Sequence, residues 1–190
     1  LKRLWQAAFD DTPEGTLFYF ARRHLPPNML VYEAEGQPVA MLTMLPVTLH
    51  FAGEARPGRY IFAVATDEGF RGKGLSTRLL EAAHQHMRDQ GDAAAVLAPA
   101  EKALFSFYEK RGYQTTFYAD HALIQGEDLP PYAGLCREAT VQEHQKLRDQ
   151  AFAQSRLYVA WDEPALAYAM TSTRLYGGVT LYAQDGGMAG

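Results

Sequence analysis

The spacing of apolar and polar residues predicts alternating helices and strands along the first two thirds of the chain. Helical spacing recurs in four segments, over residues 1–9, 16–24, 76–90 and 100–110. Runs rich in β-branched and aromatic residues predict strands over residues 29–35, 37–45, 45–52, 59–66, 93–98 and 113–118. The first of these runs turns at Glu35-Gly36 into the second, as a hairpin does. The pattern indicates an α/β domain.

The pattern restarts after Pro130-Pro131. Strands are predicted over residues 135–139 and 178–184, and helices from Thr140 and from Pro164 to Leu175. Thr140 has the character of an N-cap, with Glu143 at the capping-box position. This order repeats the opening of the first part of the chain. We therefore expect two domains, residues 1–130 and residues 131–190.

One short segment combines glycines and cations, Arg71-Gly72-Lys73-Gly74-Leu75-Ser76-Thr77. It joins an apolar run to a predicted helix, whose first N–H groups have no intrahelical partner and carry partial positive charge. Gly72 and Gly74 lack a Cβ atom, so the backbone can approach an anion closely. Arg71 and Lys73 add full positive charges. The segment predicts a site for a phosphorylated ligand.

Two common phosphate loops do not fit this segment. A nucleoside-triphosphate loop counted from Gly69 needs a lysine where Leu75 stands. A dinucleotide loop counted from Gly72 needs a third glycine where Thr77 stands. The pattern Arg/Gln-x-x-Gly-x-Gly/Ala fits at every fixed position but the last, which is Ser76. The segment thus resembles the pyrophosphate loop of the GCN5-related N-acetyltransferase superfamily.

A second motif carries the same resemblance. Residues 105–113 read Phe-Ser-Phe-Tyr-Glu-Lys-Arg-Gly-Tyr, similar to the Phe-Tyr-x-x-x-Gly-Phe/Tyr signature that follows the loop in this superfamily. Lys110 and Arg111 suit the end of a helix, and Gly112 suits the left-handed position after it. Because two motifs occur in the expected order, a phosphate-binding loop is a stronger interpretation of residues 71–77 than an ordinary glycine-rich turn. The resemblance covers residues 1–125 and implies a mixed, mostly antiparallel sheet flanked by helices.

The resemblance implies acetyl-CoA as cosubstrate and indicates its binding residues. Pyrophosphate would bind the loop residues Arg71, Gly72, Lys73, Gly74, Leu75, Ser76 and Thr77. The thioester and pantetheine would lie along the backbone of Val64, Ala65 and Thr66. Tyr108 falls on the general-acid tyrosine of the superfamily and would protonate the leaving thiolate. Core packing is the alternative for Tyr108, since phenylalanines flank it.

The sequence identifies neither the general base nor the substrate that accepts the acetyl group. No carboxylate lies on the strand over residues 60–66, and Asp67 and Glu68 belong to a turn that is usually solvated. His84 and His86 stand two apart on a helix and cannot share a metal, so we expect no metal. The expected activity is acetyl transfer to a primary amine of a small molecule or peptide. The alternative is a non-catalytic acyl-CoA-binding regulatory or scaffold module.

The composition of the chain excludes several classes of binding partner. The net charge of −4 and the absence of a basic run argue against a nucleic-acid surface. No apolar run approaches the roughly 20 residues of a membrane span, and no signal peptide is visible, so we expect a cytoplasmic protein that does not bind membranes. The single cysteine, Cys136, excludes an internal disulfide and a cysteine-rich metal cluster.

The restarted pattern resembles tandem acetyltransferases related to the enhanced intracellular survival aminoglycoside acetyltransferases. A superfamily domain opens with a strand before its first helix, so we expect this sequence to begin inside its first domain and to stop before the second loop. The alternative is an α/β extension of separate origin. An edge strand without its hairpin partner invites pairing. We therefore expect residues 131–190 to dock on residues 1–130 or to form a homo-oligomer.

Overall fold

The computed structural model describes residues 1–118 and 134–183. They divide into two compact units. The larger unit contains residues 1–97 and 139–180, and the smaller one contains the described parts of residues 98–138 and 181–190. The expected domain boundary at residue 130 lies outside the described residues and stays a prediction.

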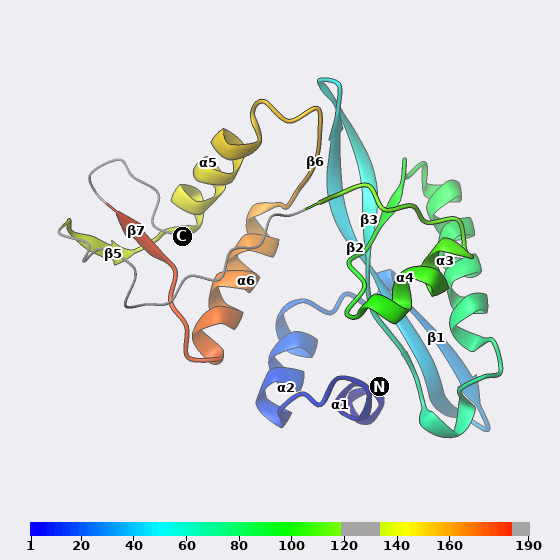
Figure 1. The fold of residues 1–190 in the computed structure, drawn as a ribbon. Helices are drawn as coiled ribbons and strands as arrows, with labels where there is room; N and C mark the ends of the chain where they lie inside the picture. Colours follow the sequence, from blue (N-terminus) through cyan, green and yellow to red (C-terminus); the bar gives the residue numbers. More distant parts are fainter. Residues whose placement is uncertain (119–133, 184–190) are drawn as a thin grey trace. The chain divides into compact units, whose positions relative to one another are not determined.

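A five-stranded sheet forms the centre of the larger unit (Figure 1). Its path is β1 (Met29–Ala34), β2 (Gln37–Phe51), β3 (Glu54–Thr66) and β4 (Ala95–Val96), and β6 (Leu157–Ala160) pairs with the far half of β2. Among the pairs in the described residues, β3 and β4 are parallel and the others antiparallel. The predicted α/β fold with a mixed, mostly antiparallel sheet flanked by helices is confirmed.

Two turns with positive φ angles build the hairpins of this sheet. Glu35 and Gly36 have φ angles of 51° and 70°, as a type I′ turn requires. Ala52 and Gly53 form the second such turn, with φ angles of 50° and 88°. The first hairpin was predicted. The second turn lies between the predicted strands 45–52 and 59–66, and β3 begins at Glu54, earlier than the predicted residue 59.

The continuity of β2 through Pro46 has a simple cause. On the edge of β2 that faces away from β3, pairing with β1 ends at Thr43 and pairing with β6 begins at Thr48. Pro46 lies between these two stretches and is exposed. A proline is tolerated at a sheet edge because its missing N–H group removes no bond of the ladder there. The prediction of two strands, 37–45 and 45–52, was therefore wrong.

Helices α1 (Lys2–Phe9) and α2 (Pro13–Arg22) cover one face of the sheet, and α3 (Leu75–Gln90) covers the other (Figure 1). The rings of Trp5 and Tyr19 stack with centroids 4.0 Å apart. Tyr19 Oη donates to Thr43 Oγ1 of β2 at 3.2 Å, and both residues are fully buried. This bond anchors α2 to the sheet, since it satisfies two polar groups that are out of reach of water.

Local signals set the ends of these helices. Thr12 accepts a hydrogen bond from the Gly15 N–H, and Pro13 occupies the first helical position, so α2 begins before the predicted residue 16. Helix α3 ends as predicted at Gly91, whose φ angle is 76°.

Directly after α3, Asp92 and Arg59 of β3 form a largely buried ion pair at 2.8 Å. Strand β4 is shorter than the predicted 93–98.

Residues 139–180 pack against residues 1–97 within the larger unit. Their elements are β6 and the helices α5 (Val141–Phe152) and α6 (Glu163–Leu175). Helix α5 starts with the predicted capping box of Thr140 and Glu143. For residues 139–180, the structure therefore shows docking on the first part of the chain, one of the two outcomes expected for residues 131–190.

Contacts of three kinds connect the segment to the first helices and the sheet. Strand β6, which the sequence pattern did not predict, pairs with the end of β2. The ring of Tyr168 stacks on that of Phe18 with centroids 5.1 Å apart. Tyr176 Oη donates to Asp11 Oδ1 at 2.8 Å, and the other carboxylate oxygen accepts from Trp5 Nε1 at 2.8 Å. Asp11 thus joins the C-cap residue of α6 to Trp5 of α1.

Replacement of Tyr168 by phenylalanine is expected to reduce the loss of stability at high pH. Burial raises the pKa of Tyr168 to about 12. The folded state therefore favours the neutral phenol, and its contribution is complete below pH 10 and is lost as the pH rises towards 12. Because the side chain is only partly buried, we expect a difference of at most about 1 kcal/mol at pH 11. Thermal unfolding of both proteins at pH 8 and pH 11 measures it, and equal losses would contradict it.

The smaller unit contains α4 (Lys102–Glu109), β5 (Cys136–Glu138) and β7 (Leu181–Ala183). β5 and β7 form an antiparallel pair. Gly112 has a φ angle of 85°, which confirms the predicted left-handed position after α4. The predicted strand over residues 113–118 does not form, because among the described residues no strand pairs with this segment. Of the helices in the described part of the chain, none is long and apolar enough to cross a membrane.

Candidate functional site

The glycine-rich segment lies where β3 gives way to α3. A 3-10 turn, η2 (Glu68–Phe70), follows β3 and leads into the loop. Gly72 and Gly74 both have φ angles of 75°, and a Cβ atom added to either would meet no atom within 4 Å. Gly74 is also the N-cap of α3, and it has no side chain to accept the first N–H groups of the helix. The start of this helix is thus open to an external anion.

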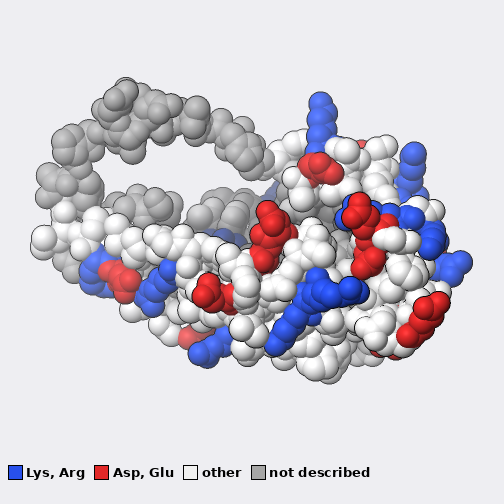
Figure 2. Space-filling view, turned by 90° about the horizontal axis from the view of Figure 1, so that it is seen from below, with Lys and Arg blue, Asp and Glu red and all other residues white. Residues whose placement is uncertain are grey.

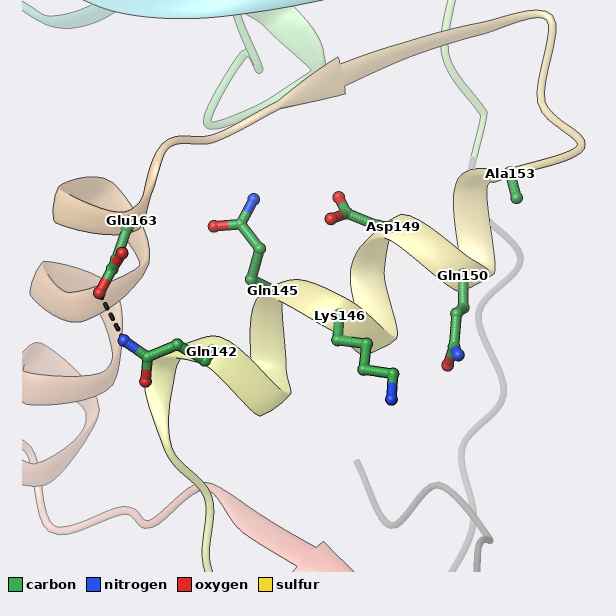
Figure 3. Close-up of a pocket in the computed structure, with 7 residues that line it drawn as sticks. All are labelled: Gln142, Gln145, Lys146, Asp149, Gln150, Ala153 and Glu163. Atoms are coloured by element: carbon green, nitrogen blue, oxygen red, sulfur yellow. Dashed lines mark hydrogen bonds between the residues drawn. The ribbon is translucent and has the colours of Figure 1, made fainter.

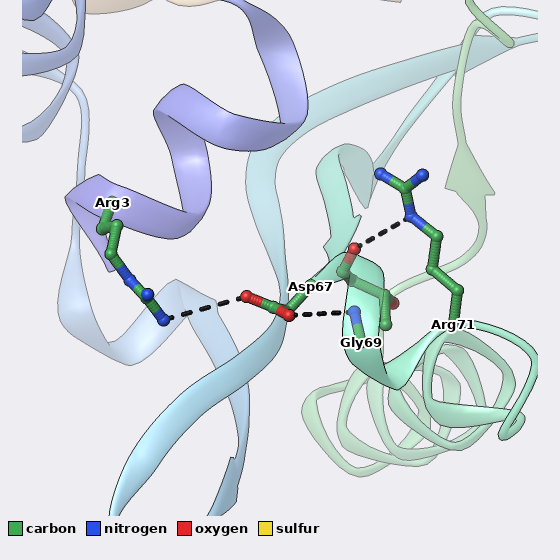
Figure 4. A network of polar contacts seen from close by, with 5 residues as sticks. Arg3, Asp67, Gly69 and Arg71 are labelled. Atoms are coloured by element: carbon green, nitrogen blue, oxygen red, sulfur yellow. Dashed lines mark hydrogen bonds and ion pairs between the residues drawn. The ribbon is translucent and has the colours of Figure 1, made fainter.

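Two cations belong to the loop, and both side chains fold back onto its backbone. Arg71 Nε donates to the Thr66 carbonyl at 3.4 Å (Figure 4). Lys73 Nζ donates to the Gly69 carbonyl at 3.1 Å and lies 4.5 Å from the centroid of the Phe70 ring. Both cations are exposed. Either can therefore exchange its weak backbone contact for a phosphate oxygen at little cost.

The remaining loop residues are anchored. The Leu75 side chain is buried beneath the start of α3. Ser76, which replaces the Gly or Ala of the superfamily pattern, has its Oγ 3.3 Å from Thr66 Oγ1. The hydroxyl that departs from the pattern thus contacts the end of β3. The structure brings together Thr66, Arg71 and Ser76, three of the predicted site residues.

A bulge in β3 precedes the loop and was not predicted. Met41 pairs with Ala65, and Thr43 pairs with Phe62, so two residues of β3 face Leu42 alone. Ala63, the first of these two, has a φ angle of 52°, which is unusual for a residue other than glycine. Strained backbone and bulges of this kind concentrate at functional sites and redirect backbone groups. The sequence carries no signal for this bulge, because alanine has no preference for a positive φ angle.

The end of β3 presents an open backbone edge. Strand β4 pairs with β3 only at Arg59 and Tyr60. Within the described residues, β3 therefore has no strand partner on that side along residues 61–66, which include Val64, Ala65 and Thr66. Unpaired N–H and C=O groups of an edge strand can bind an extended ligand that carries amide groups.

Tyr108 belongs to the smaller unit and lies near the end of α4. Its side chain is buried, and its ring packs edge-on against the rings of Phe107 and Tyr113, with centroids 5.1 and 5.6 Å away. Burial raises the pKa of Tyr113. These contacts hold the Tyr108 ring in a defined position, which suits both a packing role and a proton donor.

A hollow of about 440 Å³ lies on α5 and involves none of the predicted site residues (Figure 3). Its lining includes Gln142, Lys146, Asp149 and Glu163, and Gln142 Nε2 donates to Glu163 Oε1 at 2.6 Å. Small-molecule sites are mainly apolar with a few polar groups. The residues that line this hollow include none of the glycine-rich segment and none of the other predicted site residues, so the loop remains the candidate site.

Surface charge adds little to the assignment of the site. In Figure 2, acidic and basic side chains are interspersed over the face seen, without a continuous field of one sign. The exposed cations of the loop, Arg71 and Lys73, are accordingly local features of the glycine-rich segment.

Comparison with known proteins places this loop in a family. The family model described as an acetyltransferase (GNAT) domain matches residues 1–116. No curated protein matches. A GCN5-related N-acetyltransferase from Kribbella flavida is 18% identical with a TM-score of 0.67, over 96% of this chain and 48% of its own. A protein of Enterococcus faecalis V583, described as a probable N-acyltransferase, is 19% identical with a TM-score of 0.65, over 89% of this chain and 45% of its own.

A third structure, a GCN5-related N-acetyltransferase from Anabaena variabilis, is 24% identical with a TM-score of 0.51, over 56% of this chain and 27% of its own. The chain spans less than half the length of each of these three proteins. At these identities the likeness concerns the fold. Because the family model spans residues 1–116 of the 190, and the loop and fold agree with it, the chain belongs to the acetyltransferase (GNAT) domain family.

Proposed function

We propose that this chain transfers the acetyl group of acetyl-CoA to a primary amine of a small molecule or peptide. The observation that carries the proposal is the loop itself. Gly72 and Gly74 both adopt positive φ angles, at an uncapped helix start flanked by two exposed cations. Such a start combines N–H donors with the positive end of a helix dipole. The pyrophosphate of acetyl-CoA suits it.

The open edge of β3 supports the placement of the rest of the cosubstrate. Pantetheine carries two amide groups, which can pair with the backbone of Val64, Ala65 and Thr66 as an added strand does. The bulge at Ala63 lies at the same place, and a bulge leaves its extra residue outside the hydrogen-bond ladder. An N–H group freed in this way can stabilise the negative charge that develops on the thioester oxygen, and one such donor contributes roughly 3–4 kcal/mol.

The proposed reaction is a direct attack. The neutral amine nitrogen forms a bond to the thioester carbonyl carbon, the carbon–sulfur bond breaks, and the nitrogen gives its proton to water, directly or through a base. The sulfur leaves as a thiolate, and Tyr108 donates the proton that converts it to the thiol of CoA. We propose this role for Tyr108 from the sequence motif and from the packing that fixes its ring. The general base is left unassigned.

We further propose that residues 131–190 open a second domain of the same kind, as in tandem acetyltransferases related to the enhanced intracellular survival proteins. The succession of β5, α5, α6 and β7 supports it, because it contains the expected strand, helix, helix and strand. Strand β6, which stands between the two helices and pairs with β2, is not part of that expected order. Two structural relatives are about twice as long as the matched region. The alternative of a non-catalytic acyl-CoA-binding module is favoured by one observation, the burial of Tyr108 among aromatic rings.

Incubation with acetyl-CoA and a panel of primary amines tests the proposal. We expect amine-dependent release of free thiol, with one acetylated amine formed per thiol. Saturable binding of acetyl-CoA without thiol release from any amine would favour the binding module. The absence of binding would contradict both functions.

A further inference from the structure

Asp67 connects three parts of the larger unit (Figure 4). Its backbone N–H donates to the Val39 carbonyl of β2 at 2.8 Å. Its Oδ1 accepts from the Gly69 N–H at 3.1 Å, which makes Asp67 the N-cap of η2. Its Oδ2 lies 3.8 Å from Arg3 Nη2 of α1. Asp67 thus ties the turn that leads into the phosphate loop to the sheet and to the first helix.

A carboxylate at this place is unfavourable for anion binding taken alone. Two charges of the same sign a few ångströms apart repel each other, even where water screens them. Asp67 comes four residues before Arg71, the first residue of the loop, and its side chain is 31% exposed. A role other than charge must therefore explain its position, and Figure 4 shows its oxygens directed to Gly69 and Arg3.

We propose that Asp67 is a positioning residue for the phosphate loop. Its carboxylate holds the η2 turn through the Gly69 N–H, so that Arg71 and the glycines start from a fixed point. Arg3 offsets the negative charge beside the incoming phosphate. This role rests on the proposed function. Holding the loop before the ligand arrives raises affinity, because less conformational freedom is lost on binding.

Two variants of Asp67 separate capping from charge. Asp67→Ala removes the acceptor, and we expect acetyl-CoA to bind about fivefold more weakly, the effect of losing one cap. Asp67→Asn keeps a carbonyl acceptor and loses the charge, so we expect wild-type affinity or better. Glu68→Ala, one residue on and exposed, is the matched control and should bind like wild type. Calorimetric titration with acetyl-CoA measures all three.

The inference fails if Asp67→Ala binds as tightly as wild type, or if Asp67→Asn loses as much affinity as Asp67→Ala. A steady-state readout adds a second test. A positioning role predicts a higher KM for acetyl-CoA with kcat unchanged. An equal fall of kcat would assign Asp67 to the chemical step and overturn the inference.

Arg3 is tested by a double-mutant cycle. Arg3→Ala should weaken binding of acetyl-CoA about twofold at low salt, the range of an exposed ion pair. The same change in the Asp67→Asn background should have no effect, because no charge is left to offset. Lys2→Ala, an adjacent exposed cation of α1, is the control. Equal effects in both backgrounds would overturn the role given to Arg3.

Amide hydrogen exchange distinguishes this inference from the proposed function. In the ligand-free protein, exchange of the Gly69 N–H should be faster in Asp67→Ala than in wild type and Asp67→Asn. A wild-type protein that does not bind acetyl-CoA would refute the proposed function together with the inference. Normal wild-type binding with unchanged Gly69 exchange in Asp67→Ala would refute the inference alone.

Discussion

Replacement of Tyr108 by phenylalanine is expected to lower kcat about 100-fold or more and to leave the affinity for acetyl-CoA unchanged. Phenylalanine keeps the ring that packs against Phe107 and Tyr113, so only the hydroxyl group is lost. A proton donor to the leaving thiolate acts in the transition state and not in the bound ground state. Thiol release under saturating substrate measures kcat, and calorimetry measures affinity.

Tyr113→Phe is the matched control for this change. Tyr113 is a partly buried tyrosine in contact with the Tyr108 ring, and its variant should keep wild-type turnover. Normal turnover of Tyr108→Phe on a verified amine would show that Tyr108 is a packing residue. Loss of activity in both variants would point to altered packing of this aromatic group.

Replacement of Gly74 by valine is expected to weaken binding of acetyl-CoA about tenfold or more. The φ angle of Gly74 is +75°, and a β-branched residue resists such an angle strongly. In the ligand-free protein a Cβ atom here meets nothing within 4 Å. The added side chain therefore harms binding by displacing the loop backbone and by filling the space in which the phosphate would lie.

Gly91→Val controls for the effect on the fold. Gly91 ends the same helix with a φ angle of 76°, and a Cβ atom there also meets nothing within 4 Å. Both variants should lose similar unfolding free energy, since the backbone strain is the same. Only Gly74→Val should lose affinity in calorimetry. Equal affinities of the two variants, with the fold intact, would count decisively against the phosphate loop.

The features that were predictable from the sequence depend on local chemistry. The start of α3 directly after the glycines of the loop, its end at Gly91 and the capping box at Thr140 are each specified by residues a few positions apart. The same holds for the turn at Glu35-Gly36, where both angles are positive. Such signals persist whatever the rest of the chain does.

The features that were missed depend on pairing between distant segments. The bulge at Ala63 exists because two residues of β3 face one residue of β2. Strand β6 is defined by its partner β2, which lies far earlier in the chain. Residues 113–118 have the composition of a strand and find no partner among the described residues. Strand propensity depends on context, so composition could not decide these cases.

We propose that acetyl-CoA binds with its pyrophosphate on the loop of residues 71–77. Titration of ¹⁵N-labelled protein with acetyl-CoA, followed by amide chemical shifts, tests it most directly. We predict saturable shifts that are largest for Gly72, Lys73 and Gly74, with further shifts at Val64, Ala65 and Thr66. Shifts centred on the polar hollow of α5, or no saturable shift at the loop, would contradict the claim.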